Sequence, residues 1–519
     1  MGFFFFIMSC LQYCFVLATI IRMHKIKLNL YLYGALTMNV ICILCDSLNR
    51  HFLAPFGEKI AHTPNLDWLA EQSHVFTRHF SGSLPTMPTR REVWTGYHDF
   101  LWRPWGALEP WDKDVAGILR EQDVMTMLIN DSYHLYEVGS GNYHFNFEGW
   151  DFIRGHEFDP WITAPADMPA HDGQLGERYA RNMSSMVNEE DYCAPKTMRS
   201  VENWLEKNHM HEQFFLMVDE FCPHEPFHCP EYYLKRYPTQ YNGPLLFWTK
   251  YGEKTHDEIE TEHLRAQYAA TTEMLDKHLG RVFAKMTDLD LWKNTALILM
   301  TDHGHYLGEH GLFGKPPYPD YNTLSHIPLF VYVPDANGGK KVDSVTGNVD
   351  IFATIMDLFG VEKDSRLHSK SLLPVIRGES DRAREWTLYG YYGRWISVTD
   401  GKRTYIRAPQ DLESELNVYS MCWQFSHFKN PCEFIDDSLE IGRFIPHVDM
   451  PVGRQPFDPA RLFKKEDLAA NYLFDMENDP AQENNLAGTD AEKDCEELLR
   501  CALKSVNAPA EQIKRMGLE

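Results

Sequence analysis

Residues 40–46, VICILCD, and residues 295–302, TALILMTD, decide the fold of this chain. Each segment is a short run of mainly apolar side chains that stops at an acid, as a buried strand of an α/β sheet does. In open α/β sheets, ligands collect at the carboxyl ends of the strands. We therefore expect Asp46 and Asp302 to lie together at one edge of a large sheet.

His303 follows Asp302, so two strand-end carboxylates and one imidazole are expected close together. Oxygen-rich ligands with one imidazole suit Ca²⁺, Mn²⁺ or Mg²⁺, and Zn²⁺ is a further alternative. The sequence predicts one divalent metal ion, with Ca²⁺ or Mn²⁺ as the first expectation. His305 and His310 lie in a glycine-rich loop that need not direct them at one point, so a second metal ion is not expected.

Residues 85–96, PTMPTRREVWTG, place a hydroxyl close to an arginine at an expected helix start. Pro88 favours a first helical turn, and the helix is expected to continue over residues 89–94. Backbone N–H groups and the positive end of the helix dipole would then face whatever Thr86 contacts, as in sites for tetrahedral oxyanions. Thr86 is therefore a candidate nucleophile that also contacts the metal ion. The alternative is a proline turn that caps a surface helix.

With these elements in order, the chain resembles the sulfatase branch of the alkaline phosphatase-like superfamily over about residues 39–334, with weaker similarity to about residue 488. The resemblance implies an α/β fold in which helices flank a large mixed β-sheet, with a smaller C-terminal antiparallel-sheet subdomain. It also implies a metal-dependent hydrolase of sulfate or phosphate-type esters. The motifs that carry the resemblance are Asp46, HTPNLDWLA at 62–70, the segment 86–96, Tyr133-His134-Leu135, Pro223-His224-Glu225-Pro226, Thr301-Asp302-His303-Gly304, GEHG at 308–311, and Lys315.

The same resemblance implies the residues of the site. The implied metal ligands are Asp46, Thr86, Asp302 and His303, and the implied catalytic residues are Thr86, Arg90, His134, His224 and Lys315. Arg90 offers a planar fork for two oxygens of the substrate. Either His134 or His224 could protonate the departing alkoxide.

Three positions depart from the family pattern. Usual sulfatases carry Cys or Ser at the position of Thr86, which is oxidised to formylglycine, and threonine cannot yield that aldehyde because its β-carbon bears a methyl group. A sulfated or phosphorylated Thr86 must instead be released by direct attack of water, which phosphorus tolerates well, so Thr86 favours a phosphorus ester. Ser47 stands where many relatives have a second acid, and Ser132 where the family often has lysine.

Two classes of function follow. The favoured class is a metal-dependent hydrolase that cleaves a sulfate or phosphate-type ester through Thr86, and phosphodiester or phosphonate monoester cleavage competes with sulfate ester cleavage. The rival class is a catalytically inactive binding protein on a sulfatase scaffold. Because Thr86, Arg90, Asp302, His303 and Lys315 are all retained, activity is favoured. The sequence identifies neither the alcohol of the ester nor the oligomeric state.

The composition agrees with a large enzyme. A chain of 519 residues with 44% hydrophobic side chains buries a substantial core. Its formal charge of −24 argues against nucleic-acid or acidic-membrane partners. An anionic substrate, either a small molecule or a glycan ester, must therefore be attracted locally by the metal ion, Arg90 and Lys315.

We expect three parts: a hydrophobic leader at 1–37, a sulfatase-like catalytic domain at 38–381, and a C-terminal subdomain at 382–519. Helical periodicity predicts helices over residues 262–286, 351–359 and 492–506. Asp400-Gly401 predicts a hairpin turn.

The leader allows two interpretations. Residues 3–21 are almost uninterruptedly apolar and basic residues follow them, which predicts a membrane anchor with the catalytic domain on the cytoplasmic side. Alternatively, translation begins at Met38 and the protein is a cytoplasmic enzyme without an anchor. The eleven cysteines show no dense disulfide framework, which also favours the cytoplasm.

Overall fold

The computed structural model centres on an eight-stranded mixed sheet with the strand order β12-β2-β11-β8-β1-β6-β4-β5. Neighbouring strands are parallel except where β11 pairs with β8 and β2. The predicted strands at 40–44 and 295–301 are β1 and β8, and every residue of both is buried. The strands are β1 (Asn39–Cys45), β2 (His74–Phe80), β4 (Met125–Asn130), β5 (Gly149–Phe152), β6 (Phe214–Glu220), β8 (Thr295–Met300), β11 (Leu329–Tyr332) and β12 (Lys340–Gly347).

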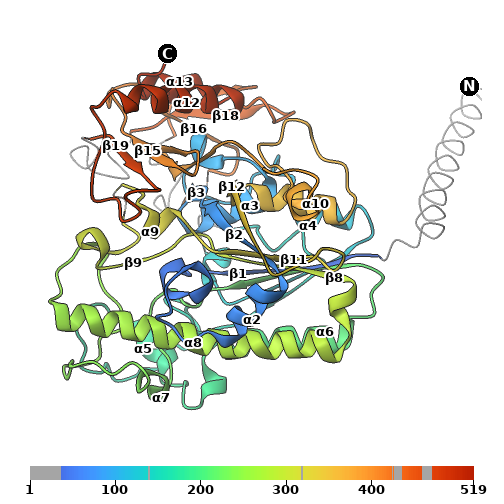
Figure 1. Ribbon diagram of the computed structural model, residues 1–519, viewed down its shortest axis with the longest axis vertical. Helices are drawn as coiled ribbons and strands as arrows, with labels where there is room; N and C mark the ends of the chain where they lie inside the picture. Colours follow the sequence, from blue (N-terminus) through green and yellow to red (C-terminus); the bar gives the residue numbers. More distant parts are fainter. Residues whose placement is uncertain (1–36, 138–140, 317–318, 424, 426–434, 459–469) are drawn as a thin grey trace, which may run out of the picture. The chain divides into compact units, whose positions relative to one another are not determined.

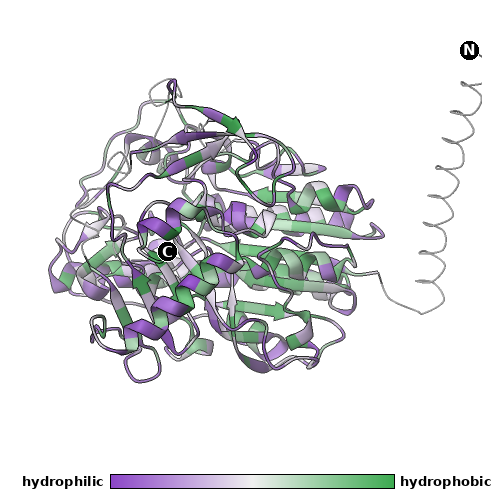
Figure 2. Ribbon diagram, turned by 90° about the horizontal axis from the view of Figure 1, so that it is seen from above, coloured by the Kyte–Doolittle hydropathy of each residue, from purple (hydrophilic) through white to green (hydrophobic). Residues whose placement is uncertain are grey.

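Helices cover both faces of this sheet (Figure 1). One face packs against α2 (Pro64–Gln72), α6 (Cys193–Asn208) and α8 (Glu258–Asp288), which share one hydrophobic core with β1, β6 and β8. On the other face lie α3 (Thr86–Thr95), α4 (Val115–Arg120) and α10 (Asp350–Leu358). Hydrophobic residues concentrate in the central strands, as burial between two helical layers requires (Figure 2). The predicted helices at 262–286 and 351–359 are confirmed as α8 and α10.

A second sheet has the order β19-β15-β14-β13-β3. The strands β13, β14, β15 and β19 of this sheet pair antiparallel. The predicted hairpin joins β14 to β15, and α12 packs on these strands. The strand β3 comes from the segment before Thr86 and pairs in parallel with β13, so this sheet fixes the start of α3. The elements are β3 (Ser83–Leu84), β13 (Thr387–Tyr391), β14 (Ile396–Thr399), β15 (Arg403–Arg407), β19 (Tyr472–Asp475), α12 (Ala491–Ser505) and α13 (Ala510–Arg515).

Shorter elements complete the structure. Two three-stranded sheets contain β7 (Gly252–Glu253), β9 (Tyr306–Leu307) and β10 (Leu312–Gly314), and β16 (Asn417–Ser420), β17 (Glu440–Gly442) and β18 (Val452–Pro456). The other α-helices of the described residues are α5 (Glu177–Met183), α7 (Glu231–Leu234), α9 (Asn322–Ser325) and α11 (Leu373–Ile376). Short 3₁₀ turns cover residues 50–52, 54–56, 99–101, 133–136, 189–191, 291–293 and 309–311.

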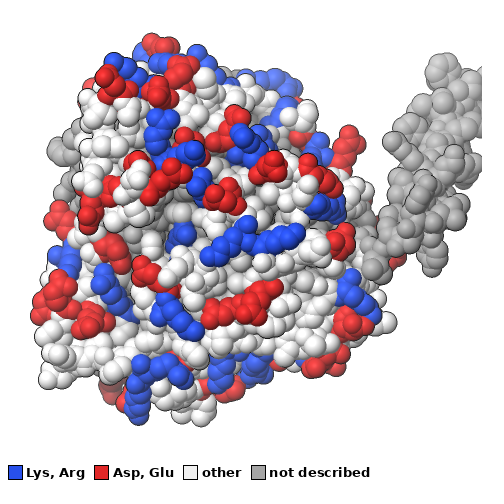
Figure 3. Space-filling model, viewed as in Figure 1, with Lys and Arg blue, Asp and Glu red and all other residues white. Residues whose placement is uncertain are grey.

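The structure describes residues 37–137, 141–316, 319–423, 425, 435–458 and 470–519. Residues 39–519 form one unit, and the start of a C-terminal subdomain near residue 382 stays a prediction. The apolar segment at 3–21 lies outside the described residues. Among the described helices, none has both the length and the apolar character needed to cross a bilayer. Acidic and basic side chains are interspersed on the face seen in Figure 3.

Candidate active site

Three carboxylates meet where neighbouring parallel strands end. Leu44 of β1 pairs with Met300 of β8 on one side and with Asp219 of β6 on the other. Because these strands end at the same level, Asp46, Asp219 and Asp302 lie at one edge of the sheet, and all three side chains are fully buried. The sequence analysis missed Asp219, although it too follows an apolar run, at residues 214–218 of β6.

Asp46, Asp302 and His303 form a group that fits a metal ion. Their ligand atoms all lie within 4.8 Å of one another, and no other such group occurs in the described part of the chain. The His303 Nδ1 lies 2.8 Å from the Gly304 carbonyl, so Nδ1 carries the proton and Nε2 offers a lone pair. Burial, assisted by Lys315, lowers the pKa of His303 to about 3, which keeps the ring neutral as a metal ligand must be. The buried Nε2 of His303 has no hydrogen-bond partner among the described residues, as expected of an atom that faces a cation, whereas Asp46 Oδ2 is paired with Arg90 Nη2 at 3.0 Å.

Ser47 orients both acids of this group. Its backbone N–H donates to Asp302 Oδ1 at 3.0 Å, and its hydroxyl donates to Asp46 Oδ1 at 2.8 Å. The residue has a left-handed backbone conformation with φ of 63°, which is uncommon outside glycine. Ser47 thus supplies two hydrogen-bond donors to the carboxylates of this group.

The two acids differ in their affinity for protons. Burial alone would raise the pKa of Asp46, but Lys315 and Arg90 outweigh burial and hold it well below its usual value. Burial and the charge of Asp46 raise the pKa of Asp302 to about 7, against the opposing effect of Arg90. Two close carboxylates that resist simultaneous ionisation favour a bound cation.

Thr86 begins α3, two residues earlier than the sequence predicts, and is completely buried. Lys315 Nζ donates to Thr86 Oγ1 at 2.8 Å and lies 3.8 Å from Asp46 Oδ1. One lysine therefore connects the candidate nucleophile with the candidate metal group. The helix ends at Thr95, and Gly96 follows in the left-handed conformation with φ of 80°.

Arg90 binds the strand-end carboxylates. Its Nε and Nη2 donate to the two oxygens of Asp219 at 2.8 and 2.6 Å. The Nη1 donates to Asp302 Oδ2 at 3.0 Å and to the Thr86 carbonyl at 3.1 Å, and Nη2 also lies 3.0 Å from Asp46 Oδ2. The guanidinium is fully buried, so the fork that the sequence analysis assigns to substrate oxygens is directed at protein oxygens here.

The two histidines that could protonate the departing alkoxide carry different charges in the structure. His134 lies between Glu137, at 2.5 Å, and Glu157, at 3.3 Å. Burial alone would lower the pKa of His134, but hydrogen bonds to these carboxylates raise it to about 9. Burial and Lys315 instead hold the pKa of His224 well below its usual value, and its Nδ1 lies 2.6 Å from the Glu225 carbonyl. His134 is therefore a cation at neutral pH, and His224 is neutral.

A second buried acid lies beside this centre. Glu225 accepts a hydrogen bond from the Tyr251 hydroxyl, and its Oε2 lies 3.5 Å from His305 Nδ1. Burial raises the pKa of Glu225 to about 7, although Lys315 opposes this. The sequence gives no signal for Tyr251. Glu225 lies in the motif at 223–226, but the sequence does not predict a role for its carboxylate.

The remaining positions of interest lie apart from one another. His310 stacks on Tyr321 with the ring centroids 3.8 Å apart, whereas His305 faces Glu225. Ser132 is fully buried at the start of the 3₁₀ turn that carries His134, and its hydroxyl has no hydrogen-bond partner.

Comparison with known proteins agrees with this geometry. The family model described as Sulfatase matches residues 38–361. Arylsulfatase K of Homo sapiens is 24% identical over 374 residues, which cover 65% of this chain and 66% of that protein. Iduronate 2-sulfatase of Mus musculus is 23% identical over 515 residues, which cover 86% of this chain and 90% of that protein.

Solved structures with the same fold include the phosphonate monoester hydrolase of Agrobacterium radiobacter. It has a TM-score of 0.65 and 18% identity, and the alignment covers 91% of this chain and 95% of that one. A protein solved in complex with its substrate D-glucosamine-2-N,6-O-disulfate has a TM-score of 0.63 and 15% identity, covering 91% of this chain and 98% of that one. These two structures support the fold alone.

Proposed function

The chain belongs to the sulfatase family, and from this premise we propose that it hydrolyses a sulfate or phosphate-type ester with the unmodified Thr86 hydroxyl as nucleophile. The observation that carries the proposal is the 2.8 Å hydrogen bond from Lys315 Nζ to Thr86 Oγ1. A charged donor at this distance stabilises the oxygen as its own proton leaves. Thr86 also stands at the N-terminus of α3, where the helix dipole favours negative charge.

The reaction then has two halves. In the first, Thr86 Oγ1 forms a bond to sulfur or phosphorus, the bond from that atom to the alcohol oxygen breaks, the hydroxyl proton leaves and the alkoxide gains a proton. In the second, water attacks the same atom, the bond to Thr86 breaks, and the threonine hydroxyl regains its proton. The products are the alcohol and the sulfate or phosphate-type anion.

Asp46, Asp302 and His303 would hold a divalent ion, for which Ca²⁺ or Mn²⁺ is the first expectation and Mg²⁺ or Zn²⁺ the alternative. When bound, the ion supplies Lewis-acid polarisation of an ester oxygen and favours the ionised form of a hydroxyl that contacts it. Arg90 holds the carboxylates in place through Asp219. Because Arg90 is fully committed to these contacts, Lys315 is the cation that we assign to the substrate oxyanion.

His134 is the group that we assign to protonate the alkoxide. Its ring is a cation at neutral pH and stands on the 3₁₀ turn that follows β4, at the carboxyl edge of the sheet. Because its two nitrogens face Glu137 and Glu157, proton donation to the alkoxide requires that the longer contact, to Glu157 at 3.3 Å, be exchanged for the substrate. His224 is neutral, and its Nδ1 is occupied by the Glu225 carbonyl, so it offers only a lone pair at Nε2. We therefore assign His224 the role of a hydrogen-bond acceptor for substrate or water.

Within this activity, phosphodiester or phosphonate monoester cleavage is the second candidate. The specific observation in its favour is Thr86 itself, since a threonyl ester is released by a second in-line attack that phosphorus tolerates better than sulfur. For the remainder of the substrate we propose a saccharide, because a protein of the same fold was solved with a disulfated glucosamine as substrate.

The test uses metal-loaded protein and four 4-nitrophenyl esters: a sulfate, a phosphate monoester, a phosphodiester and a phosphonate monoester. The proposal predicts turnover of at least one ester, with loss in Thr86→Ala and retention in Thr95→Ala. Thr95 is a matched control because it is a buried threonine at the other end of α3, with its hydroxyl bound within the helix at 2.7 Å. No turnover of any ester, with the metal bound and the fold intact, would favour the inactive binding protein.

A further inference from the structure

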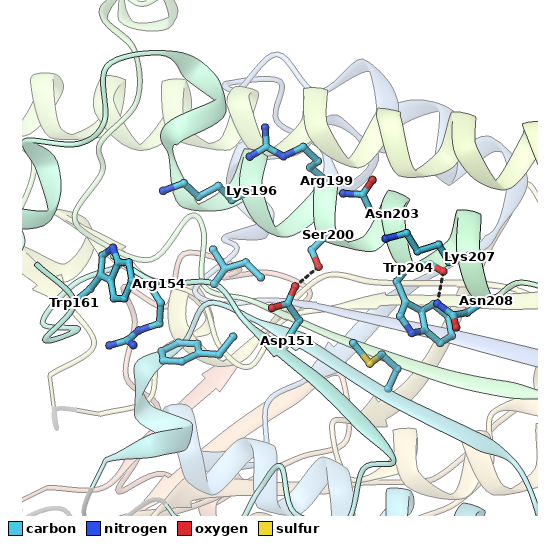
Figure 4. Close-up of a pocket in the computed structure, with 13 residues that line it drawn as sticks. Asp151, Arg154, Trp161, Lys196, Arg199, Ser200, Asn203, Trp204, Lys207 and Asn208 are labelled. Carbon is cyan, nitrogen blue, oxygen red and sulfur yellow. Dashed lines mark hydrogen bonds between the residues drawn. The ribbon is translucent and has the colours of Figure 1, made fainter.

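A cavity of about 590 Å³ lies beside the edge strand of the main sheet, between the end of β5 with its following loop and the exposed side of α6 (Figure 4). Figure 4 shows Arg154 and Trp161 at one end of the cavity and Trp204 with Asn208 at the other. The side chains of α6 line its length. None of these residues belongs to the candidate active site.

Four of the five charged side chains that line this cavity are basic. Arg154, Lys196, Arg199 and Lys207 line it, but Arg154 is already paired with Asp159 at 2.7 Å. Among the described lining residues the sole acid is Asp151, whose Oδ2 accepts from Ser200 Oγ at 2.5 Å. Within the described residues, Lys196, Arg199 and Lys207 have no carboxylate partner, and Arg199 contacts only the Glu190 carbonyl, at 3.5 Å. Uncompensated basic side chains in a chain of formal charge −24 indicate an anionic ligand.

The charges of α6 are divided between two faces of the helix. Residues 196, 199, 203 and 207 recur at helical spacing and share the face that lines the cavity. The acids of the same helix point to α8, where Glu202 binds Arg281 at 3.0 Å and Glu206 binds Lys285 at 2.7 Å. The acids are thus neutralised on the far face, which leaves the cavity with a surplus of positive charge.

Aromatic side chains add a second kind of contact. The Arg154 guanidinium lies 4.9 Å from the ring centre of Phe152 and 5.0 Å from that of Trp161. Trp161 is 53% exposed, which is unusual for so large an apolar side chain. Its open ring offers a flat apolar surface, and Ser200, Asn203 and Asn208 offer polar groups to hydroxyls.

The cavity begins at the same edge of the sheet as the candidate active site. Phe152, Asn130, Asp219 and Leu44 are successive partners across β5, β4, β6 and β1. Arg154 lies two residues after Phe152 and Asp46 lies two residues after Leu44. Because three strand spacings lie between β5 and β1, the backbones at Arg154 and Asp46 are about 14 Å apart. The cavity then extends along α6 toward Lys207, away from the catalytic edge.

We propose that this β5–α6 groove, lined by Asp151, Arg154, Trp161, Lys196, Arg199 and Lys207, binds a polyanionic oligosaccharide. Sulfate or carboxylate groups contact Lys196, Arg199 and Lys207, and one sugar ring stacks on Trp161. The inference rests on the proposed function in one respect: the saccharide is the distal part of the ester substrate, and its cleaved group reaches Thr86. An ester that spans both sites must contain more than one sugar ring, because a single ring does not cover that separation.

Binding of a size-defined heparin octasaccharide to the full chain with Thr86→Ala tests the groove without depending on turnover. The variant Lys196→Gln/Arg199→Gln/Lys207→Gln is expected to weaken binding at least tenfold, and Trp161→Ala is expected to weaken it as well. The matched control Lys235→Gln/Lys293→Gln/Lys493→Gln removes the same charge from exposed positions outside the groove and is expected to bind as the parent does. Equal binding by the groove and control variants would overturn the proposal.

Two further arms identify the ligand class and separate this inference from the proposed function. A single-stranded oligonucleotide of equal charge is expected to bind at least tenfold more weakly than the octasaccharide, and equal or tighter binding would overturn the saccharide assignment in favour of nucleic acid. The groove variant in the wild-type background is expected to hydrolyse small 4-nitrophenyl esters at an unchanged rate. Loss of that rate would overturn the assignment of the groove to a site distinct from the catalytic centre.

Discussion

The catalytic centre and the β5–α6 groove hold charge in opposite ways. In the centre, the buried Arg90 contacts Asp46, Asp219 and Asp302, each within 3.0 Å. In the groove, Lys196, Arg199 and Lys207 have no carboxylate partner within the described residues and face a cavity. Buried charges must be compensated by other groups of the protein, whereas charges that line an open cavity are solvated until a bound ligand compensates them. The difference indicates that the side chains of the catalytic centre are held in place before substrate binds. In the groove, by contrast, the charges are compensated only when the ligand is bound.

Removal of the metal ion should separate the two regions most completely. Exhaustive chelation is expected to abolish turnover and to lower the melting temperature, because Asp46 and Asp302 then repel each other. Binding of the octasaccharide to the groove is expected to remain. Turnover assays, differential scanning calorimetry and elemental analysis measure these effects, and undiminished turnover in protein shown to be metal-free would remove the metal group from the account.

Removal of one arginine should distinguish the regions by stability. Arg90→Gln leaves three buried carboxylates without their common partner, so the free energy of unfolding is expected to fall by about 3–5 kcal/mol. Arg199→Gln on the surface of α6 is expected to change it by less than about 0.5 kcal/mol. Urea denaturation of both variants measures the difference, and similar losses in the two would show that the carboxylates do not depend on Arg90.

Removal of one lysine should distinguish the regions by rate. Lys315→Gln deletes the donor to Thr86 Oγ1 and is expected to reduce kcat about 10²- to 10³-fold on a small ester, as loss of one oxyanion donor does elsewhere. Lys196→Gln is expected to leave that kcat unchanged. A Lys315→Gln effect on KM alone, with kcat retained, would mean that the lysine binds the substrate equally in the ground state and the transition state.

The smallest effect concerns pH. His134 has a pKa raised to about 9 by Glu137 and Glu157, so its ion pairs stabilise the fold fully below the unfolded pKa of about 6.5. This contribution, on the order of 2 kcal/mol, is lost as the pH rises through 9. His134→Gln should therefore flatten the fall in unfolding free energy between pH 6.5 and 9.5. His171→Gln, a control whose ring contacts only a backbone carbonyl, should keep the wild-type profile.

The sequence predicts those parts of the centre that follow from continuous local patterns. β1 and β8 are unbroken apolar runs that each end at an acid, so Asp46 and Asp302 could be placed beforehand. Asp219 comes directly after the apolar run at 214–218, within β6, so the same rule could have placed it. The binding of Arg90 by three carboxylates could not be predicted, because it depends on the order of strands from distant parts of the chain.

Other features have no local signal at all. β3 is only two residues long, and it pairs with β13 about 300 residues further along the chain. The basic side chains of the groove are separated along α6 by neutral and acidic residues, so no basic run stands in the sequence. They gather only once α6 has packed its acids against α8 and Arg154 has been placed by β5.

The central claim is that the unmodified Thr86 hydroxyl performs the first attack, and rapid acid quenching followed by mass spectrometry of the peptide that contains Thr86 tests it most directly. We expect no modification of Thr86 before substrate is added, and a sulfate or phosphate-type adduct on Thr86 during turnover. Thr86→Ala should lose the adduct and about 10³-fold in kcat, roughly 4 kcal/mol at 1.36 kcal/mol per decade, while Thr86→Ser and Thr95→Ala should retain both. Full turnover by Thr86→Ala, with no adduct on the wild-type protein, would contradict the account.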